Sequence, residues 1–414
     1  MRKWFACLAA FVLVAGFAVR VGAAPAGSGE ERIMLRSDAA RQAGLAVRHG
    51  LADGKVTAHV TAAQLTALQR QGVAYEVVPV RTVEATTAAK GGKKPGSGRS
   101  VPTSQVPYGI KMIYGDAALT PAGVSGGQGV TVAVLDTGSV NHADFTRADG
   151  SKVITACADF SQNKSSLIEG TCADGHGHGT HVTGTIAAAG GADGRGIYGV
   201  APGASILSYK VMNNQGRGYA DDIAYAIRVA ADRGANIITM SLGSSTPSSL
   251  ELDAIRYANS KGVLVIAAAG NTGPNENTIS FPGGFAEVVG VAALNPDEVV
   301  AYYSSRGMTD GNDRSIVDSE IEVAGPGTNV LSTYKDGAYA TLSGTSMATP
   351  HITGLAAKMW QGSASRTRDW LRSAAKGHDI TQAEQVDNAG PGYDIAAGYG
   401  LPQVHTLVQP LWQN

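Results

Sequence analysis

The chain has 414 residues, 43% of them hydrophobic and 16% charged, so it can bury a large core and should be globular, with more than one domain. The formal net charge of −1 hides an asymmetry, because residues 1–104 carry 14 Lys and Arg against 6 Asp and Glu, whereas the rest carries 19 against 28. The basic residues of that larger part are scattered and form no stripe interleaved with aromatic side chains. The sequence therefore predicts no nucleic-acid partner.

The N-terminus has the layout of a secretory signal peptide. A basic start at residues 1–3 precedes an apolar run at 4–19, and small residues follow at 23–26. The run is shorter than the roughly 20 residues that a membrane-spanning helix needs, and Arg20 ends it. We therefore expect residues 1–24 to be a signal peptide, the protein to be secreted, and no stable membrane anchor. An anchor that is retained is the alternative.

Residues 25–85 are predicted to form a small α+β unit. The expected elements are a strand at 55–60, an amphipathic helix at 62–71 and a strand at 73–80. Residues 86–104 contain the segment 90–98, which has no periodicity and no apolar side chain to bury. This composition is typical of an exposed linker.

Residues 105–414 alternate between apolar strands and helical patterns. Strands are expected at 130–135, 206–211, 237–240, 263–269 and 288–292, and helices at 180–189, 220–232 and 250–261. Such alternation predicts an α/β fold with a mainly parallel sheet sandwiched between helices. Functional sites in these sheets lie beyond the carboxyl ends of the strands. The polar residues Asp136, Ser241 and Asn271 all follow strand ends in this sequence.

Three motifs supply a carboxylate, an imidazole and a hydroxyl. Asp136 begins Asp-Thr-Gly, His178 stands in Gly-His-Gly-Thr-His, and Ser346 stands in Ser-Gly-Thr-Ser-Met-Ala-Thr-Pro-His at 343–351. A serine hydroxyl is a weak nucleophile unless a base activates it, and the base needs a third group to fix its tautomer and orientation. The three motifs together therefore indicate nucleophilic catalysis.

Each motif alone has another interpretation. Apolar-Asp-Thr-Gly is also found in aspartic proteases, but these need two carboxylates and no second such motif follows an apolar strand. His176, His178 and His181 could be metal ligands, although no further ligands stand in register. Ser346 alone would be a helix N-cap, since an apolar helical pattern follows it.

Together, the motifs resemble the subtilisin family of serine endopeptidases over residues 105–405. The resemblance implies that Asp136 orients His178, that His178 is the general base, and that Ser346 is the nucleophile of an acyl-enzyme mechanism. It also implies that the Asn271 amide and the Ser346 N–H stabilise the oxyanion, with no cofactor required for the chemistry. Sedolisin-type peptidases share Ser-Gly-Thr-Ser but use Glu in place of the His.

The resemblance also implies how protein or peptide substrates are held. Two backbone edges should pair with an extended chain, namely Ser241, Leu242 and Gly243 on one side and Ala268, Ala269 and Gly270 on the other. Backbone pairing gives affinity with broad specificity. Thr272 supplies no carboxylate at the pocket rim, and Ser280 stands where the family often has Gly, so we expect a preference for apolar or mid-sized residues before the cut.

Residues 27–84 resemble the inhibitory propeptides of the same family, more weakly than the catalytic motifs do. The protein would be a zymogen and a monomer, its propeptide an intramolecular inhibitor, and it would cut itself near residues 100–106. The alternative is an N-terminal domain that stays attached. There are two alternatives to hydrolysis. One is a binding or scaffold protein that keeps the fold without turnover, and the other is a peptide ligase or cyclase.

Two stabilising features are expected in the catalytic region. Cys157 and Cys172 remain once the signal peptide with Cys7 is removed, so an exported protein should join them in a disulfide worth roughly 3 kcal/mol, with two free thiols as the alternative. Gln105 and Asp144 match two ligands of the family's calcium site. The segment 190–196 differs from the family's ligand loop in length and in its oxygen pattern.

Overall fold

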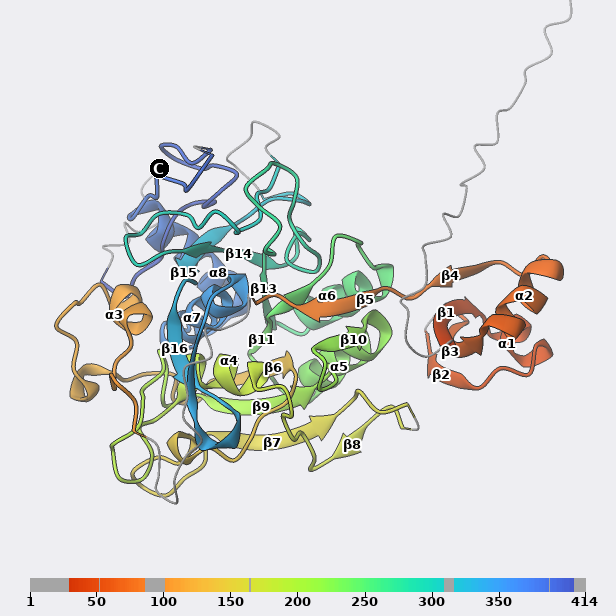
Figure 1. The fold of residues 1–414 in the computed structure, drawn as a ribbon, viewed down its shortest axis with the longest axis horizontal. Helices are drawn as coiled ribbons and strands as arrows, with labels where there is room; N and C mark the ends of the chain where they lie inside the picture. The colour runs from red at the N-terminus through yellow and green to blue at the C-terminus, as the bar shows by residue number, and fades with distance from the viewer. Residues whose placement is uncertain are drawn as a thin grey trace, which may run out of the picture. The chain divides into compact units, whose positions relative to one another are not determined.

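The computed structural model describes residues 30–51, 53–85, 101–163, 165–308, 316–386 and 388–405 (Figure 1). The signal peptide expected at 1–24 and most of the linker expected at 86–104 lie outside these residues. The chain divides into two compact units, Met1–Val77 and Val78–Asn414. Among the residues just given, no helix is both long enough and apolar enough to cross a membrane. The predicted limits of the signal peptide, propeptide and linker stay predictions.

The first unit is a four-stranded sheet with two helices. Its elements are β1 (Glu30–Arg36), α1 (Ser37–Gln42), β2 (Val47–Gly50), β3 (Lys55–Thr61), α2 (Ala62–Arg70) and β4 (Tyr75–Val77), with strand order β2-β3-β1-β4. Thr61 and Gln64 form a capping box that starts α2, because each side chain satisfies the other's backbone N–H. The strand at 55–60 and the helix at 62–71 match their predictions. The strand expected at 73–80 is shorter, and Pro79, which has no N–H to donate, follows it.

The second unit is built on an eight-stranded sheet with the order β15-β14-β13-β11-β6-β9-β7-β8. The strands are β6 (Thr131–Asp136), β7 (Ile154–Asp159), β8 (Ile168–Glu169), β9 (Ser205–Lys210), β11 (Ile237–Met240), β13 (Leu264–Ala268), β14 (Val289–Leu294) and β15 (Val323–Pro326). All neighbours pair in parallel except β7 and β8. Every residue of β11 and β13 is buried, which requires helices on both faces of the sheet.

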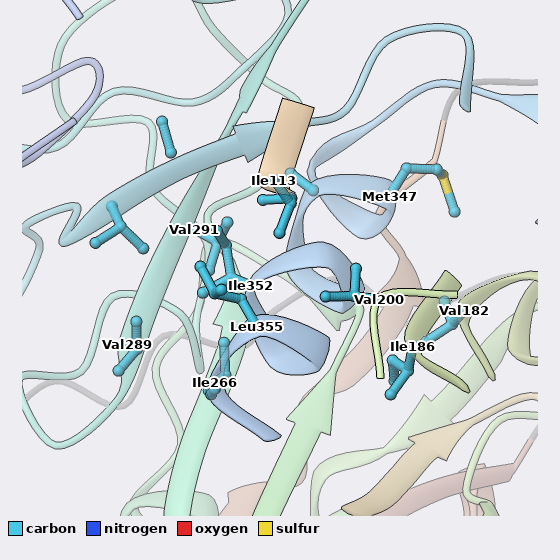
Figure 2. Close-up of a cluster of buried hydrophobic side chains, with 14 of the residues drawn as sticks. Ile113, Val182, Ile186, Val200, Ile266, Val289, Val291, Met347, Ile352 and Leu355 are labelled. Atoms are coloured by element: carbon cyan, nitrogen blue, oxygen red, sulfur yellow. The ribbon is translucent and has the colours of Figure 1, made fainter. Parts of the chain in front are cut away.

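The helices of this unit are α3 (Tyr108–Tyr114), α4 (His178–Ala187), α5 (Ala220–Asp232), α6 (Ser249–Ser260), α7 (Thr345–Lys358) and α8 (Ala364–Lys376). α4 and α7 pack against each other, as do α5 and α6, and α7 lies along β13, β14 and β15. Figure 2 shows part of this core, where Ile352 and Leu355 of α7 lie beside Val291 and Ile266 of the sheet. The predicted α/β fold with a mainly parallel sheet between helices is confirmed.

Two small sheets complete the second unit. β16 (Val330–Thr333) and β17 (Tyr339–Leu342) form a hairpin, and β5 (Val80–Val83) lies between β10 (Arg217–Tyr219) and β12 (Leu242–Gly243). Short 3₁₀ turns occupy Pro121–Gly123, Ala143–Phe145 and Lys335–Gly337. The predicted disulfide is confirmed, since Cys157 on β7 is bonded to Cys172 with their Cα atoms 5.5 Å apart.

Candidate active site

Asp136 and His178 lie together at the carboxyl end of β6. Asp136 is the last residue of β6 and His178 is the first residue of α4, and each side chain is only 1% exposed. His178 Nδ1 lies 2.7 Å from Asp136 Oδ1, which also accepts the N–H of Thr137 at 2.7 Å. A carboxylate accepts only, so Nδ1 carries a proton, and in the neutral ring Nε2 presents a lone pair. Nε2 makes no hydrogen bond to any described residue.

A glycine allows the two segments to approach this closely. A Cβ at position 179 would lie 2.2 Å from the carbonyl oxygen of Gly138 and 3.1 Å from Asp136 Oδ1. Any side chain at Gly179 would therefore separate α4 from the end of β6. The glycine beside the histidine in the motif thus allows the backbone to pack tightly at the start of α4.

Asp174 is a residue that the sequence analysis missed. Its buried Oδ1 accepts the hydroxyl of Thr137 at 2.8 Å and the N–H groups of His176 and Gly177 at 3.0 and 2.7 Å. Its Oδ2 accepts both the N–H and the hydroxyl of Thr180, at 2.9 and 2.7 Å. Asp174 thus holds the start of α4 against the segment after β6. An Asp just before a helical pattern is the signal that could have identified it.

Ser346 lies in the first turn of α7, where free N–H groups and the helix dipole favour negative charge. Its N–H donates to the carbonyl oxygen of Glu84 at 3.0 Å. Its hydroxyl donates to Ser241 O at 2.9 Å, and the Ser241 hydroxyl donates in return to Ser346 O at 2.9 Å. In this structure the hydroxyl therefore contacts Ser241, not His178.

The amide of Asn271 is oriented by Thr345. Asn271 Oδ1 accepts the N–H of Thr345 at 2.9 Å and its hydroxyl at 3.2 Å. With both donors on the oxygen, the NH₂ group must point the other way, and Nδ2 lies 3.4 Å from Glu84 Oε2. A Cβ at Gly344 would lie 2.5 Å from Glu84 O and 3.2 Å from Asn271 Nδ2, so both atoms border the same space.

β5 is an extended strand that leads to Glu84 beside Ser346. It pairs antiparallel with β10, where Arg81 is opposite Gly218, and with β12, where Val83 is opposite Leu242. The Glu84 N–H then donates to Ser241 O at 3.2 Å. The expected edge at Ser241, Leu242 and Gly243 therefore does pair with an extended chain.

The second expected edge, at Ala268, Ala269 and Gly270, makes other backbone contacts in this structure. Ala268 lies in β13, between β11 and β14, and the Ala269 backbone is bonded to Val291 O and to the N–H of Ser280. The Gly270 N–H donates to Thr345 Oγ1 at 3.1 Å, and its carbonyl oxygen accepts the N–H of Ser305 at 2.9 Å. Substrate pairing along this segment stays a prediction. The other edge of β5 pairs with β10, whose short sequence, Arg-Gly-Tyr, carries no alternation that would have predicted a strand.

The side chain of Glu84 occupies a pocket beside Ser346. The Ser280 hydroxyl donates to Glu84 Oε1 at 3.2 Å, and a Cβ at Gly243 would lie 3.2 Å from the same oxygen. A Cβ at Gly270 would lie 2.4 Å from Ser280 Oγ, so this glycine and Ser280 border the pocket together. Burial raises the pKa of the Glu84 carboxyl, although Ser280, Asn271, His178 and Arg81 all oppose the shift.

The other histidines of the region have structural roles. His181 Nε2 lies 3.0 Å from Val330 O and 3.2 Å from Ala340 O, and burial lowers its pKa to about 3, so it is a neutral donor. His176 is half-buried, with its ring centroid 6.1 Å from that of His178. Burial lowers the pKa of His176 as well.

Gln105 and Asp144, the expected calcium ligands, lie beside the 190–196 segment. Gln105 Nε2 donates to the carbonyl oxygens of Gly194 at 2.6 Å and Gly196 at 3.2 Å. A Cβ at Gly196 would lie 2.1 Å from Asp144 Oδ1, so the carboxylate is next to the same turn. Carbonyl, amide and carboxylate oxygens are the ligands that calcium prefers, and turning the Gln105 amide over would present its oxygen.

The same groups are also satisfied without an ion. Asp144 Oδ2 accepts the N–H of Ile197 and the hydroxyl of Tyr339, both at 2.8 Å. Gln105 has its two carbonyl acceptors. The oxygen atoms at this turn are of the kind that calcium prefers, but their hydrogen bonds do not require an ion. Calcium at this turn stays a prediction.

A mainly parallel α/β sheet with an Asp–His pair and a serine at a helix start is the arrangement of a serine peptidase, and comparison with known proteins names the class. The model of the subtilase family matches residues 127–400, so the chain belongs to that family. It is 45% identical over 319 residues to "Subtilisin" from Bacillus sp. (strain TA39), covering 73% of each chain. It is 37% identical to "Subtilisin BL" from Lederbergia lenta, covering 66% of this chain and 90% of the relative.

Solved structures agree with this assignment. "Sphericase" matches with a TM-score of 0.69 and 45% identity, and "S41 Psychrophilic Protease" with 0.66 and 44%, each over 73% of this chain and 99% of the other. The protein is thus a serine endopeptidase of the subtilisin type that acts on protein substrates. Catalysis in this family needs no cofactor.

Proposed function

We propose that the protein is a secreted serine endopeptidase, made as a precursor, that first cuts its own chain between Glu84 and Ala85. The observation that carries this proposal is the position of Glu84. Its carbonyl oxygen accepts the Ser346 N–H, its side chain fills the adjoining pocket, and the preceding strand is paired on both edges. These are the contacts that a bound substrate needs at the bond to be cut.

The reaction follows from the groups around that bond. The Ser346 side chain rotates from Ser241 O toward His178 Nε2, gives its proton to that nitrogen, and its oxygen attacks the Glu84 carbonyl carbon. The Ser346 N–H and Asn271 Nδ2 stabilise the oxyanion, and Asp136 stabilises the protonated His178. The C–N bond then breaks, the proton passes to the new Ala85 amine, and an ester joins Glu84 to Ser346. One water molecule, activated by His178, hydrolyses that ester.

The bond between Glu84 and Ala85 lies just before the linker expected at residues 86–104. The sequence favoured a cut near residues 100–106, whereas the contacts just described favour the bond after Glu84. Later trimming of residues 85–104 would then produce a shorter N-terminus, because a segment with few apolar side chains is easily reached by a second enzyme molecule. Residues 25–84 would act as the inhibitor, and the enzyme would be a monomer.

The contacts around Glu84 support broad specificity, with a preference for an uncharged side chain before the cut. Backbone pairing with β10 and β12 is independent of sequence, and the raised pKa of Glu84 indicates that the pocket favours the neutral carboxyl. We therefore expect mid-sized neutral side chains to be accepted before the cut, which extends the apolar preference expected from the sequence.

The test is turnover of a chromogenic peptide together with a serine-directed fluorophosphonate label. The purified protein should hydrolyse the peptide and take the label on Ser346, and Ser346→Ala should do neither. A folded protein that takes no label would support a scaffold protein instead. A product mixture in which peptides are joined would support a ligase.

A further inference from the structure

Arg81 is a fully buried charged residue on β5. It is the fourth residue before the proposed cut, counting Glu84 as the first. Its side chain is 0% exposed, and so is that of Glu251, with which it forms an ion pair. Glu251 lies in the first turn of α6, 170 residues further along the chain.

The Arg81 guanidinium is bound at every nitrogen. Nε donates to both carboxylate oxygens of Glu251, at 3.0 and 3.1 Å, and Nη2 donates to Oε2 of the same group. Nη1 donates to the hydroxyl of Ser244 and, at 2.9 Å, to the carbonyl oxygen of Thr246. Two carboxylate oxygens and a carbonyl oxygen placed in this way match the planar donors of a guanidinium group, so this site is specific for arginine.

Glu251 depends on this partner. Burial raises the pKa of its carboxyl, Arg81 opposes the shift, and Asp221 of α5 adds to it through its own negative charge. Among the described residues, Arg81 is the only basic side chain that forms an ion pair with Glu251. A carboxylate placed in this way attracts a cation and is unfavourable for an apolar side chain.

We propose that Glu251 determines specificity in a subsite that recognises a basic side chain, arginine above lysine, at the fourth position before the cut. The inference rests on the proposed function, because only a peptidase that binds Arg81–Glu84 as its substrate uses this subsite. Once the first cut releases this strand, the Glu251 carboxylate, Ser244 and Thr246 line the vacated space. A substrate with arginine four residues before its cleavage site restores every hydrogen bond made by Arg81.

The expected preference is about 10- to 100-fold in kcat/KM. Removing one partner of a fully buried ion pair can cost more than this factor, but water can enter a subsite at the surface and reduces the loss. Lysine should fall between arginine and leucine, because an ammonium group cannot bind both carboxylate oxygens and Thr246 O in the same plane.

The test compares two chromogenic tetrapeptides on the processed wild-type enzyme, Arg-Thr-Val-Glu and Leu-Thr-Val-Glu. The arginine peptide should be cleaved with 10- to 100-fold higher kcat/KM. A third peptide, Leu-Arg-Val-Glu, has the same charge one position later and should gain nothing over Leu-Thr-Val-Glu. Equal rates for the first two peptides would overturn the inference and leave the proposed function standing. Failure to cleave any of them would overturn the proposed function itself.

A second arm uses the full-length precursor. Arg81→Leu and Glu251→Leu should each slow the cut after Glu84, whereas the double variant should recover most of the rate, since an apolar pair can replace a buried ion pair. Asp253→Asn is the matched control, because Asp253 is an exposed carboxylate on the same helix. A role for Glu251 in the subsite would be contradicted if the rate loss of the double variant equalled the combined losses of the two single variants. It would also be contradicted if Asp253→Asn slowed the cut as much as Glu251→Leu.

Discussion

Replacing Asp174 by asparagine tests how the catalytic histidine is held. Asp174 accepts five hydrogen bonds from four residues at the start of α4 and after β6. If the asparagine oxygen keeps the three donors of Oδ1, its NH₂ group replaces Oδ2 and faces the N–H of Thr180. Asp174→Asn therefore loses that bond and leaves two donors facing each other.

The magnitude follows from these bonds. A hydrogen bond to a charged group is worth about 1.5–3 kcal/mol, and the bonds that remain become weaker when the acceptor is neutral. Burying an amide costs less than burying a carboxylate, which offsets part of the loss. We expect the free energy of unfolding to fall by about 2–3 kcal/mol, and the midpoint of thermal unfolding by roughly 3–4 °C, because the unfolding entropy of a unit this large is high.

The assay has two readouts. Thermal unfolding is measured in the Ser346→Ala background, which prevents self-digestion, and turnover is measured with the active serine present. Turnover should fall about 10- to 100-fold, because Asp174 bonds to Thr137, whose hydroxyl accepts the N–H of Gly179 next to His178. Asp253→Asn should change neither quantity. Wild-type stability together with wild-type turnover in Asp174→Asn would refute the reasoning.

The remaining predictions concern the oxyanion, the pocket and the calcium ligands. Asn271→Ala should lower turnover about 100-fold with little change in KM, the size of effect already known for this donor in subtilisin; unaltered turnover would exclude the role. The bound carboxyl of Glu84 has a raised pKa, so the processed enzyme should bind the neutral form of this side chain more tightly. An amidated peptide of residues 80–84 should therefore inhibit most strongly below the pKa of a free Glu, and its inhibition should weaken as pH rises through the raised pKa. The same peptide with Gln at its end corrects for titration of the enzyme, and a constant ratio of the two inhibition constants would contradict the prediction. If Gln105 and Asp144 hold calcium, a chelator should shorten the half-life at elevated temperature, and an unchanged half-life would show that they do not.

Local patterns in the sequence were sufficient for the large sheet and for the residues at its strand ends. Thr131–Asp136 and Ala220–Asp232 were predicted to within a residue, because a buried apolar run and an amphipathic pattern are properties of the segment itself. The Asp136–His178 pair follows from two motifs that such a sheet brings to one edge.

Contacts between distant segments were not predictable in the same way. The pair of Arg81 with Glu251 and the place of β5 between β10 and β12 depend on residues more than 100 positions apart. Nothing in the segment 80–85 indicates a partner, and β10 has three residues with no pattern. Ser280 was identified as a pocket residue, but its hydrogen bond to Glu84 required the strand to be placed first.

The most direct test of the account is a time course of precursor processing for the wild-type chain and for Ser346→Ala, followed by mass spectrometry of the released N-terminal fragment. The first wild-type fragment should end at Glu84, and the Ser346→Ala chain should stay uncut. A first fragment that ends near residues 100–106 would contradict the placement of the cut. A Ser346→Ala chain that is processed at the wild-type rate would contradict the claim that this serine cuts its own chain.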